Sequence, residues 1–543
     1  MCIGGYLVLF LGIILSYTLV LLFLSHFSQR KAKTVGQFLD GGKQFGVWRV
    51  FLMMTAMWGA SMFSVEIDTG YLSGLSAIWF GISTIVSSFL VAAVLLRPFQ
   101  KIGYLTNSHL IGRRYGKKAR DFAALVIGIT FPIFAMKNVL AAASFLHVLL
   151  GWNLATVLIA TTILVIVYVS LGGIMSLAYV QVVNLIVFTV GLLVAAYFGL
   201  RHQAVLSTPL SGQQQVPGFH GMMGVGMATI LVWFGMSILN SVSAQAEFQT
   251  ITAAKDVKKG KLGVYLSSFA LIVFAVIPAL LGMAAREHIG LMKSGLMAFP
   301  SYLQLVAPHW ALIVVGLSFW AAALIWCAPL MFSGASSFGL DLFNRQSLSH
   351  DSNAVRRFTR LSMIIQGILI VIFALARPGQ LAWWAVFGLT LRNAAIVGPT
   401  ISYLWWPAVK ERTILISMVL GVVSGFCWNA LTGFSATKFA LGIDPMWVGT
   451  GLSMIVIVVG TFVQNRGQMH LCRHVVRLPL GILFGFLGTV FFAISALLGT
   501  WGWSSLLGAD LFVGILLWFV AAILLTENRE VTAVETGPLV FNA

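Results

Sequence analysis

Acidic residues are scarce in this sequence of 543 residues. It holds 15 Asp and Glu against 33 Lys and Arg, and 9% of its residues are charged, whereas an average soluble domain is about 25% charged. Hydrophobic residues make up 59%, and apolar runs recur from end to end. This composition excludes a string of soluble domains and predicts an all-α polytopic membrane protein. A nucleic-acid-binding surface needs a clustered basic patch on a soluble fold. The net charge of +18 is therefore read as information on which side of the membrane each loop lies.

Cysteines are few as well, and a Walker A sequence is absent. Cys2, Cys327, Cys427 and Cys472 lack CxxC spacing and His partners at metal spacing, so we expect no metal site and no disulfide framework. Without Walker A, ATP is excluded as the energy source, and the loops are too short for a nucleotide-binding domain. We expect no cofactor, nucleic acid or obligatory protein partner. The expected partners are the lipid bilayer and a small-molecule solute.

Apolar runs of about 18 to 25 residues can cross the hydrocarbon core as helices. We predict about fifteen transmembrane helices, at residues 3–26, 47–68, 73–96, 121–149, 154–171, 174–200, 222–243, 262–285, 309–343, 358–376, 381–407, 411–434, 446–464, 478–498 and 505–525. If the N-terminus lies outside, 26 Lys and Arg fall in inside loops and five in outside loops. Positive charge is enriched on the cytoplasmic side. The pattern therefore predicts an outside N-terminus and an inside C-terminus.

Six short segments carry motifs that occur together, in the same order, in one family of carriers. They are Phe38–Gly46 (FLDGGKQFG), Gly74–Trp79 (GLSAIW), residues 97–120, Tyr168–Asn184 with its Gly-Gly pair, Gln245–Asp256 (QAEFQTITAAKD), and Ser336-Ser337 followed by Asp341. In these segments and in helix number, the chain resembles a divergent member of the sodium:solute symporter family, which contains sugar, proline and pantothenate carriers.

The resemblance implies a LeuT-type core of two inverted five-helix repeats. We expect residues 1–34 to form a leading helix and the start of the first loop, and residues 35–407 the ten-helix transport core, with repeats at roughly 47–200 and 222–407. Residues 408–543 would form four trailing helices and a short cytoplasmic tail. In such carriers, discontinuous helices at corresponding repeat positions form the binding site. We expect breaks in the helix at 47–68, near Glu66, Asp68 and Gly70, and in the helix at 222–243.

Four charged residues stand out within the predicted spans. Glu66, Asp68, Lys137 and Arg392 sum to zero charge, and a charge at the bilayer centre costs several kcal/mol or more. One interpretation is mutual pairing that fixes helix packing, or a pair of carboxylates exposed in an outer vestibule. The other is that these residues bind the substrate, a proton or both. Gln181, Asn240 and Gln245 are further candidates, although buried amides often serve only as hydrogen bonds between helices.

The sequence departs from the family pattern where the coupling sodium binds. Counted back from Asp341, the family's two sodium-binding hydroxyl residues fall on Ile325 and Trp326, and neither has a side-chain oxygen. The Asp of the family's Thr-Asp pair is here Gln181. We therefore expect these sodium-site positions to be degenerate. A proton, a fixed Lys137 ammonium in place of the ion, or uncoupled facilitation would replace sodium, so both H⁺ and Na⁺ remain candidate coupling ions.

Aromatic residues could gate the transport path. Trp58, Tyr71 and Trp233 are the candidates, but seventeen Trp are present and many fit an interfacial belt.

Together these features predict a secondary-active transporter. We expect it to move a small polar organic solute, such as an amino acid or carboxylate, by alternating access with cation coupling. The alternative is a membrane sensor that uses a symporter-like domain to detect ligand without transport. An enzyme is not expected, because no clustered catalytic dyad is evident. The expected location is the plasma membrane, as a multi-pass protein of a bacterial inner membrane.

Overall fold

The computed structural model describes residues 3–29, 44–102, 106–170, 174–201, 217–290, 292, 294–343, 352–466, 468–472, 474–500 and 506–528. Within these ranges, 11 helices are long and apolar enough to cross a membrane, or up to 12 if one bent pair is a single span. The chain is thus an all-helical, multi-pass membrane protein, as its composition predicts. The number of fifteen spans and the orientation of the termini stay predictions. The motif Phe38–Gly46 lies mostly outside the described residues.

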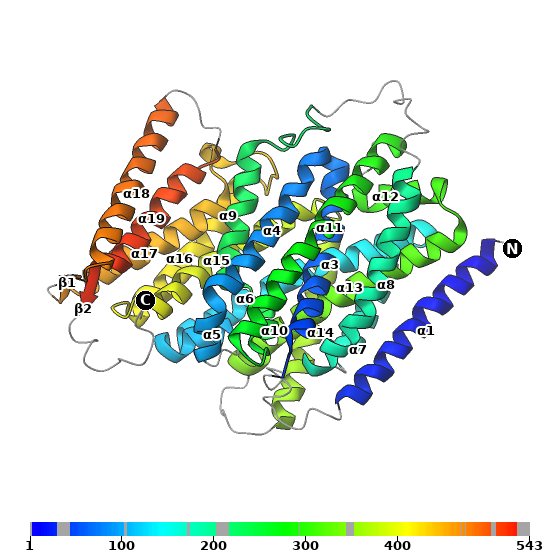
Figure 1. Ribbon diagram of the computed structural model, residues 1–543, viewed down its shortest axis with the longest axis horizontal. Coiled ribbons are helices and arrows are strands. Elements are labelled where there is room, and N and C mark those ends of the chain that lie inside the picture. The colour runs from blue at the N-terminus through cyan, green and yellow to red at the C-terminus, as the bar shows by residue number, and fades with distance from the viewer. Residues whose placement is uncertain are drawn as a thin grey trace. The chain divides into compact units, whose positions relative to one another are not determined.

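Helices make up almost all of the described chain (Figure 1). In order the elements are α1 (Ile3–Gln29), α3 (Val47–Ser73), η2 (Gly74–Ala77), α4 (Ile78–Leu90), η3 (Val91–Leu95), α5 (Leu96–Ile102), α6 (Asn107–Leu150), α7 (Leu154–Ser170), α8 (Ile174–Arg201), α9 (Met227–Ser243), α10 (Gln245–Thr252), α11 (Val257–Ile289), α12 (Gly295–Val306), α13 (His309–Ser336), η5 (Ser337–Phe343), α14 (Ser352–Ala376), α15 (Leu381–Trp405), α16 (Glu411–Leu431), η6 (Ala440–Gly442), α17 (Pro445–Gln464), β1 (Met469–Leu471), α18 (Arg477–Thr500), α19 (Ala509–Leu525) and β2 (Thr526–Asn528).

The chain divides into two units that interleave in sequence. The first comprises residues 1–100, 131–226 and 245–385. Within it, α3 and α11 run side by side (Figure 1), and glycines allow their backbones to touch. A Cβ at Gly70 would lie 2.3 Å from the carbonyl oxygen of Ala279, and one at Gly282 would lie 2.2 Å from that of Ile67. Small residues permit such close packing where lipid supplies no hydrophobic drive between helices.

The second unit comprises residues 101–130, 227–244 and 386–543. Within it α16 packs on α17 and α18 packs on α19. Gly421 and Gly449 meet at the first of these interfaces, where a Cβ on either one would lie within 3.0 Å of the other's carbonyl oxygen. The strands β1 and β2 form a short antiparallel pair, with His470 opposite Glu527.

Two expectations about broken helices are changed by the structure. α3 is one continuous helix from Val47 to Ser73, so the predicted break near Glu66, Asp68 and Gly70 is wrong. Its polar residues serve other purposes, because Gly70 provides close contact with α11 and Asp68 bonds neighbouring helices.

The second break exists, but lies later than predicted. α9 and α10 form a bent pair interrupted at Ala244, beyond the glycines that were expected to weaken the helix. Asn107 donates a hydrogen bond to the carbonyl oxygen of Ser243 at 2.9 Å, and the Ser243 hydroxyl donates to Asn393 at 2.7 Å. In an uninterrupted helix the backbone carbonyl of Ser243 would accept a hydrogen bond from a later residue of the same helix. At the break the side chain of Asn107 provides that donor instead.

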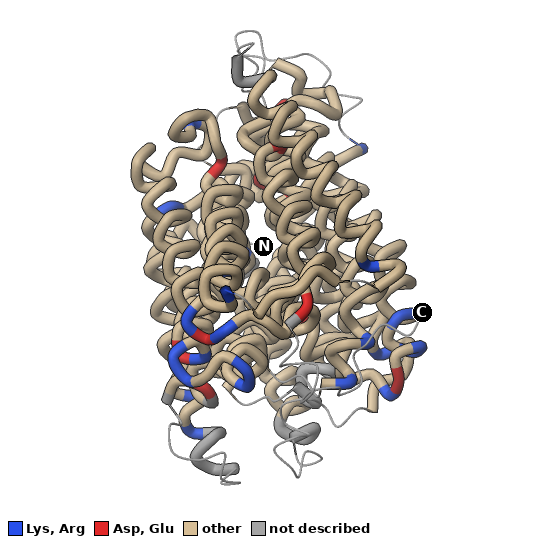
Figure 2. The backbone as a smooth tube through the Cα atoms, turned by 90° about the vertical axis from the view of Figure 1, so that its left-hand side faces the viewer, with Lys and Arg blue, Asp and Glu red and all other residues tan. Residues whose placement is uncertain are grey.

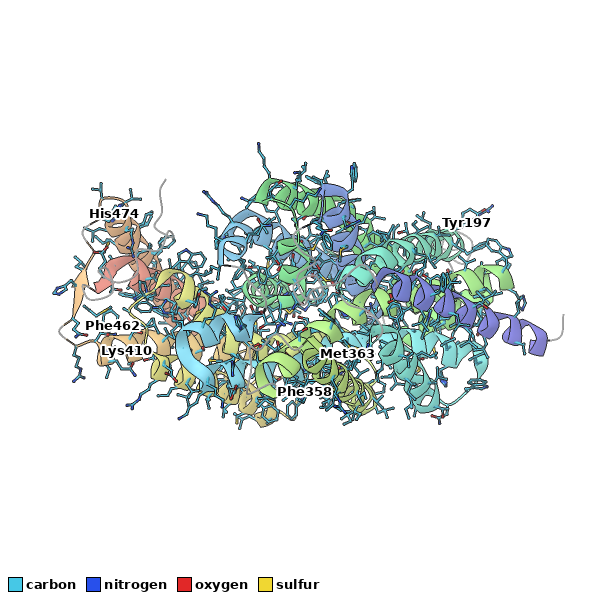
Figure 3. The ribbon with its side chains drawn as sticks, turned by 90° about the horizontal axis from the view of Figure 1, so that it is seen from below. Tyr197, Phe358, Met363, Lys410, Phe462 and His474 are labelled. Atoms are coloured by element: carbon cyan, nitrogen blue, oxygen red, sulfur yellow. The ribbon has the colours of Figure 1, made fainter. Side chains whose placement is uncertain are left out.

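The connection expected at residues 286–308 also contains a helix, α12. Ser294 caps its first turn, accepting a hydrogen bond from the N–H of Leu296 at 3.1 Å. In Figure 2, Lys, Arg, Asp and Glu lie mainly at helix ends and in connections, and long stretches of helix carry none of them. Figure 3 shows apolar side chains on the outer faces of helices, such as Tyr197 on α8, which is 55% exposed.

Candidate functional site

Asp68 joins three helices of the first unit. Its Oδ1 accepts hydrogen bonds from the backbone N–H of Gly295 at 3.0 Å and the hydroxyl of Ser294 at 3.3 Å. Its Oδ2 accepts one from the N–H of Leu381 at 3.0 Å. Gly295 and Leu381 begin α12 and α15, and helix N-termini attract negative charge. Asp68 is therefore bonded as a structural cap, and within the described residues the interpretation that the intramembrane charges pair with one another does not hold for it.

Glu66 lies two residues earlier and is bonded very differently. The side chain is fully buried, and neither carboxyl oxygen accepts a hydrogen bond of normal geometry. The backbone of Gly81 on α4 faces the carboxyl group, and a Cβ at Gly81 would lie 2.7 Å from Oε1. The described part of the chain gives Glu66 no ion pair, so the predicted pairing fails here too. A buried polar group left in this way needs an explanation beyond packing.

Lys137 is the buried cation of the first unit. It lies on α6, is 2% exposed, and its Nζ is 5.4 Å from the ring centroid of Trp326, 5.8 Å from that of Phe134 and 5.9 Å from that of Phe80. Three aromatic rings within 6 Å stabilise an ammonium group through their electron-rich faces. The structure thus keeps this charge in the interior by means of an aromatic cage, defined here as Phe80, Phe134 and Trp326.

The neighbouring Asn138 fixes the position of Lys137. Its amide donates to the carbonyl oxygens of Ala60 on α3 at 2.8 Å and Ala322 on α13 at 3.2 Å, and it accepts from the Ser64 hydroxyl. Sequence reasoning missed Asn138. The available signal was its place beside the buried Lys137 in an apolar helix, where an amide must find partners.

Ile325 and Trp326, the positions predicted to correspond to the family's sodium ligands, lie in α13 and are buried. The side-chain amide of Gln181 donates to the carbonyl oxygen of Ile325 at 3.2 Å. The indole N–H of Trp326 donates to the carbonyl oxygen of Phe134 at 2.7 Å. The side chain of Gln181 thus presents an N–H donor to the backbone of Ile325. The side chain of Trp326 is itself an N–H donor. Neither position offers a side-chain oxygen, as the sequence predicts.

Trp58 links the aromatic cage to a carboxylate that sequence reasoning missed. Its ring stacks at a tilt on Trp326, with centroids 5.7 Å apart, and its side chain also interacts with Glu247 of α10. Glu247 is 1% exposed and accepts a hydrogen bond from the Ser88 hydroxyl at 3.2 Å. The predicted span ended at residue 243, which placed Glu247 in a loop. In the structure the chain resumes after Ala244 as the buried helix α10, and this places Glu247 in the protein interior.

The remaining candidates of the first unit serve as hydrogen-bonding groups. Gln245 donates to the carbonyl oxygen of Ser333 at 2.9 Å and to the hydroxyl of Ser337 at 3.0 Å. The Tyr71 hydroxyl donates to the carbonyl oxygen of Gly290 and accepts from the N–H of Met292 at 2.5 Å. Trp58 and Tyr71 are both buried, and their action as gates stays a prediction.

In the second unit, Arg392 on α15 and Asn240 on α9 are brought together. The Arg392 guanidinium donates to the Asn240 side-chain oxygen, and Ser243 also contacts that oxygen at 3.5 Å. Trp233 lies on the same helix α9 and is 4% exposed. The structure thus groups Lys137, Trp58 and the sodium-site positions in one unit, with Glu66 against α4 of that unit. It groups Arg392 with Asn240 in the other.

Comparisons with known proteins point to one family of carriers. A family model described as the sodium:solute symporter family matches residues 38–421. The chain is 21% identical over 493 residues to an uncharacterized symporter, YwcA, of Bacillus subtilis, covering 86% of this chain and 91% of that one. It is 24% identical to the human high affinity choline transporter 1 over 45% of this chain and 43% of that protein. It is also 24% identical to mouse sodium-coupled monocarboxylate transporter 2, over 48% of this chain and 44% of that protein.

Solved structures show the same fold. The chain resembles a Na⁺-coupled sialic acid symporter in a substrate-bound outward-open state, with a TM-score of 0.65 at 15% identity, covering 84% of this chain and 98% of that one. It also resembles Mhp1, a nucleobase-cation-symport-1 family transporter, with a TM-score of 0.50 at 13% identity over 79% and 94%. These LeuT-fold neighbours agree with the expected architecture, and the proteins matched are transporters rather than enzymes.

Proposed function

Because the chain belongs to the sodium:solute symporter family, we propose that it is a secondary-active carrier of a small organic carboxylate or zwitterion. Transport proceeds by alternating access and is coupled to a proton instead of sodium. The protein acts in the plasma membrane of a bacterium; the symporter YwcA, which it matches over 91% of that chain, is from the bacterium Bacillus subtilis.

The observation that carries the proposal is the buried ammonium of Lys137. An intramembrane charge is costly and marks a functional site by default. Its aromatic cage is of the kind that recognises quaternary ammonium ligands, yet here the cage already holds the protein's own cation. A choline-like solute would meet an ammonium group there and be repelled. A carboxylate solute would instead be attracted to this ammonium group, as a monocarboxylate of the kind named for the mouse relative would.

The N–H groups near Ile325 and Trp326 support the choice of coupling ion. A sodium ion needs oxygen ligands to replace its hydration shell, and the side chains at these positions supply none. A proton needs only a carboxylate that can exist in both charged and neutral forms. The first unit holds two buried glutamates that fit this requirement, the predicted candidate Glu66 and Glu247.

The test uses purified protein in liposomes and a panel of pyruvate, lactate, proline, choline and glucose, with sodium and pH gradients imposed in turn. We expect saturable uptake of a carboxylate or of proline, driven by a pH gradient and indifferent to sodium. Lys137→Met should raise the KM for that solute by about 30-fold or more, the effect of removing one partner of a buried charge pair.

Lys438→Met is the matched control, because Lys438 is exposed in a connecting loop. Its kinetics should equal those of the unmodified protein. Uptake of choline or glucose in preference to the acids, or sodium-driven uptake that ignores pH, would contradict the proposal.

A further inference from the structure

The second buried carboxylate, Glu247, lies where a coupling group would be expected to act. It is the third residue of α10, directly after the break at Ala244 that divides the bent pair. Broken helices of this kind bring polar groups to the midplane of such carriers. Glu247 is 1% exposed, so its charge in the ionised form is removed from water.

The contacts of Glu247 suit both of its protonation states. The Ser88 hydroxyl donates to Oε1 at 3.2 Å, which supports the carboxylate. The Trp58 indole interacts with the carboxyl group, although its N–H does not meet the geometry of a normal hydrogen bond. The second oxygen, Oε2, is buried without a hydrogen-bond partner among the described residues. Oε1 thus accepts a hydrogen bond, and Oε2 is available to carry a proton.

Among the described residues, no ion pair neutralises this carboxylate. α10 packs against α3, α11 and α13, and it also contacts α4 through Ser88 and α5 through Phe99. The titratable or charged residues of these five helices in the described chain are Arg49, Glu66, Asp68, Tyr71, Arg97, Lys101, Lys258, Lys259, Lys261, Tyr265, Arg286, Glu287, His288, His309 and Cys327. The electrostatic partners of Glu247 are none of these but the side chains of Ser88 and Trp58. A buried carboxylate without a counter-charge is unfavourable, so proton uptake stabilises it.

A short path of aromatic contacts connects Glu247 to Lys137. Trp58 interacts with Glu247 and stacks on Trp326 at 5.7 Å, and Trp326 lies 5.4 Å from the Lys137 ammonium. Reorientation of α10 would therefore move Trp58 and alter the aromatic cage. Glu66 lacks such a path in its bonded contacts, since it faces the backbone of Gly81.

We propose that Glu247 binds the coupling proton, an inference that rests on the proposed carboxylate carrier. The Glu247 carboxylate takes a proton from one side of the membrane to become a carboxylic acid, and releases the same proton on the other side. No other bond changes. One proton moving with one carboxylate solute makes the cycle electroneutral, so a membrane potential does not drive it.

The experiment compares the unmodified protein, Glu247→Gln and Glu247→Asp in liposomes with labelled pyruvate as the probe. An inside-alkaline gradient of one pH unit should drive about tenfold accumulation by the unmodified protein, because one pH unit is a tenfold ratio of proton activity. Glu247→Gln should exchange pyruvate across the membrane but accumulate it no more than onefold. Glu247→Asp should accumulate it, because the shorter side chain keeps a titratable group. A potential imposed with valinomycin and potassium should change none of these ratios.

A second readout needs no substrate. Asp444 is also a buried acid that titrates, so the spectra are recorded in an Asp444→Asn background. Infrared difference spectra between acidic and alkaline pH should then contain the carbonyl stretch of a buried carboxylic acid, which Glu247→Gln lacks and Glu66→Gln retains. Asp256→Asn is the matched control, because Asp256 is an exposed carboxylate at the start of α11. It should leave both readouts unchanged.

The two proposals fail in different ways. If no solute of the panel is carried, the proposed function fails and the infrared band still decides the role of Glu247. If Glu247→Gln keeps pH-driven accumulation, or keeps the titrating band, Glu247 is not the proton site. If this variant loses exchange as well as accumulation, the band again decides: its loss supports the assignment, and its presence overturns it.

Discussion

Asp68 and Glu247 are both buried acids of the same unit, yet their surroundings differ. Asp68 accepts three hydrogen bonds, two of them from the backbone at the starts of α12 and α15. Glu247 accepts one, from a hydroxyl, and leaves an oxygen unbonded. Several fixed N–H donors hold a carboxylate in one position and favour its charged form, so such a group fixes structure. One with few donors can exchange a proton, so the number of donors separates the two roles.

The largest expected effect is on stability, at Asp68. Asp68→Ala leaves the N–H groups of Gly295 and Leu381 buried without an acceptor and should lower the free energy of unfolding by about 3 to 5 kcal/mol. Asp68→Asn keeps an acceptor oxygen and should lose less. Thermal unfolding of the detergent-purified protein, followed by intrinsic fluorescence, measures both. An Asp68→Ala protein as stable as the unmodified one would remove the cap role.

Asp444 provides an intermediate case outside the spans, because its carboxylate accepts a hydrogen bond from a backbone N–H. It caps α17, accepting from the N–H of Met446 at 2.9 Å, and burial raises its pKa to about 7. The folded protein then binds a proton that the unfolded chain releases near pH 4. Stability falls as pH rises through this window, by up to about 1.4 kcal/mol per pH unit.

The variant Asp444→Asn removes this titration and keeps the capping oxygen. Its advantage in stability over the unmodified protein should therefore be small at pH 4 and grow toward pH 7. Unfolding temperatures measured across this range would check the sign. An advantage that shrinks with rising pH would contradict the assignment.

The fold was largely predictable from the sequence, but the helix breaks were not. The break predicted in α3 is absent, and the second break lies later than predicted. Long apolar runs and loop charges predict membrane helices because each signal lies within the segment that forms the helix or directly beside it. Asp68 looks like a helix breaker in sequence, but its donors belong to residues more than 220 positions away. The break at Ala244 depends on Asn107 and Asn393, which lie 136 and 150 positions from Ser243 in the sequence. Tertiary partners of this kind leave no local pattern.

The site was predictable in part for the same reason. Lys137 stood out because a charge in an apolar helix is visible in sequence, and the lack of side-chain oxygens at Ile325 and Trp326 could be counted directly. Glu247 was missed because the predicted helix stopped before it. The aromatic cage was invisible, since Phe80 and Trp326 are brought to Lys137 only by folding.

The smallest expected effect is a gain in stability at Glu66. Its carboxyl group makes no hydrogen bond of normal geometry, so Glu66→Met removes a buried polar group without stranding a partner. The free energy of unfolding should rise by about 1 to 2 kcal/mol. Thermal unfolding measures the change. A clear loss of stability would mean that Glu66 has a stabilising contact, and would place it with Asp68 instead of Glu247.

The contrast between the two acids is tested most directly by comparing Asp68→Asn and Glu247→Gln in the same liposomes, under an inside-alkaline gradient of one pH unit. The account predicts that Asp68→Asn, though less stable, still accumulates pyruvate about tenfold, one proton per solute. Glu247→Gln, with unfolding behaviour close to that of the unmodified protein, should only equilibrate it. Accumulation that is lost in Asp68→Asn and kept in Glu247→Gln would contradict the account.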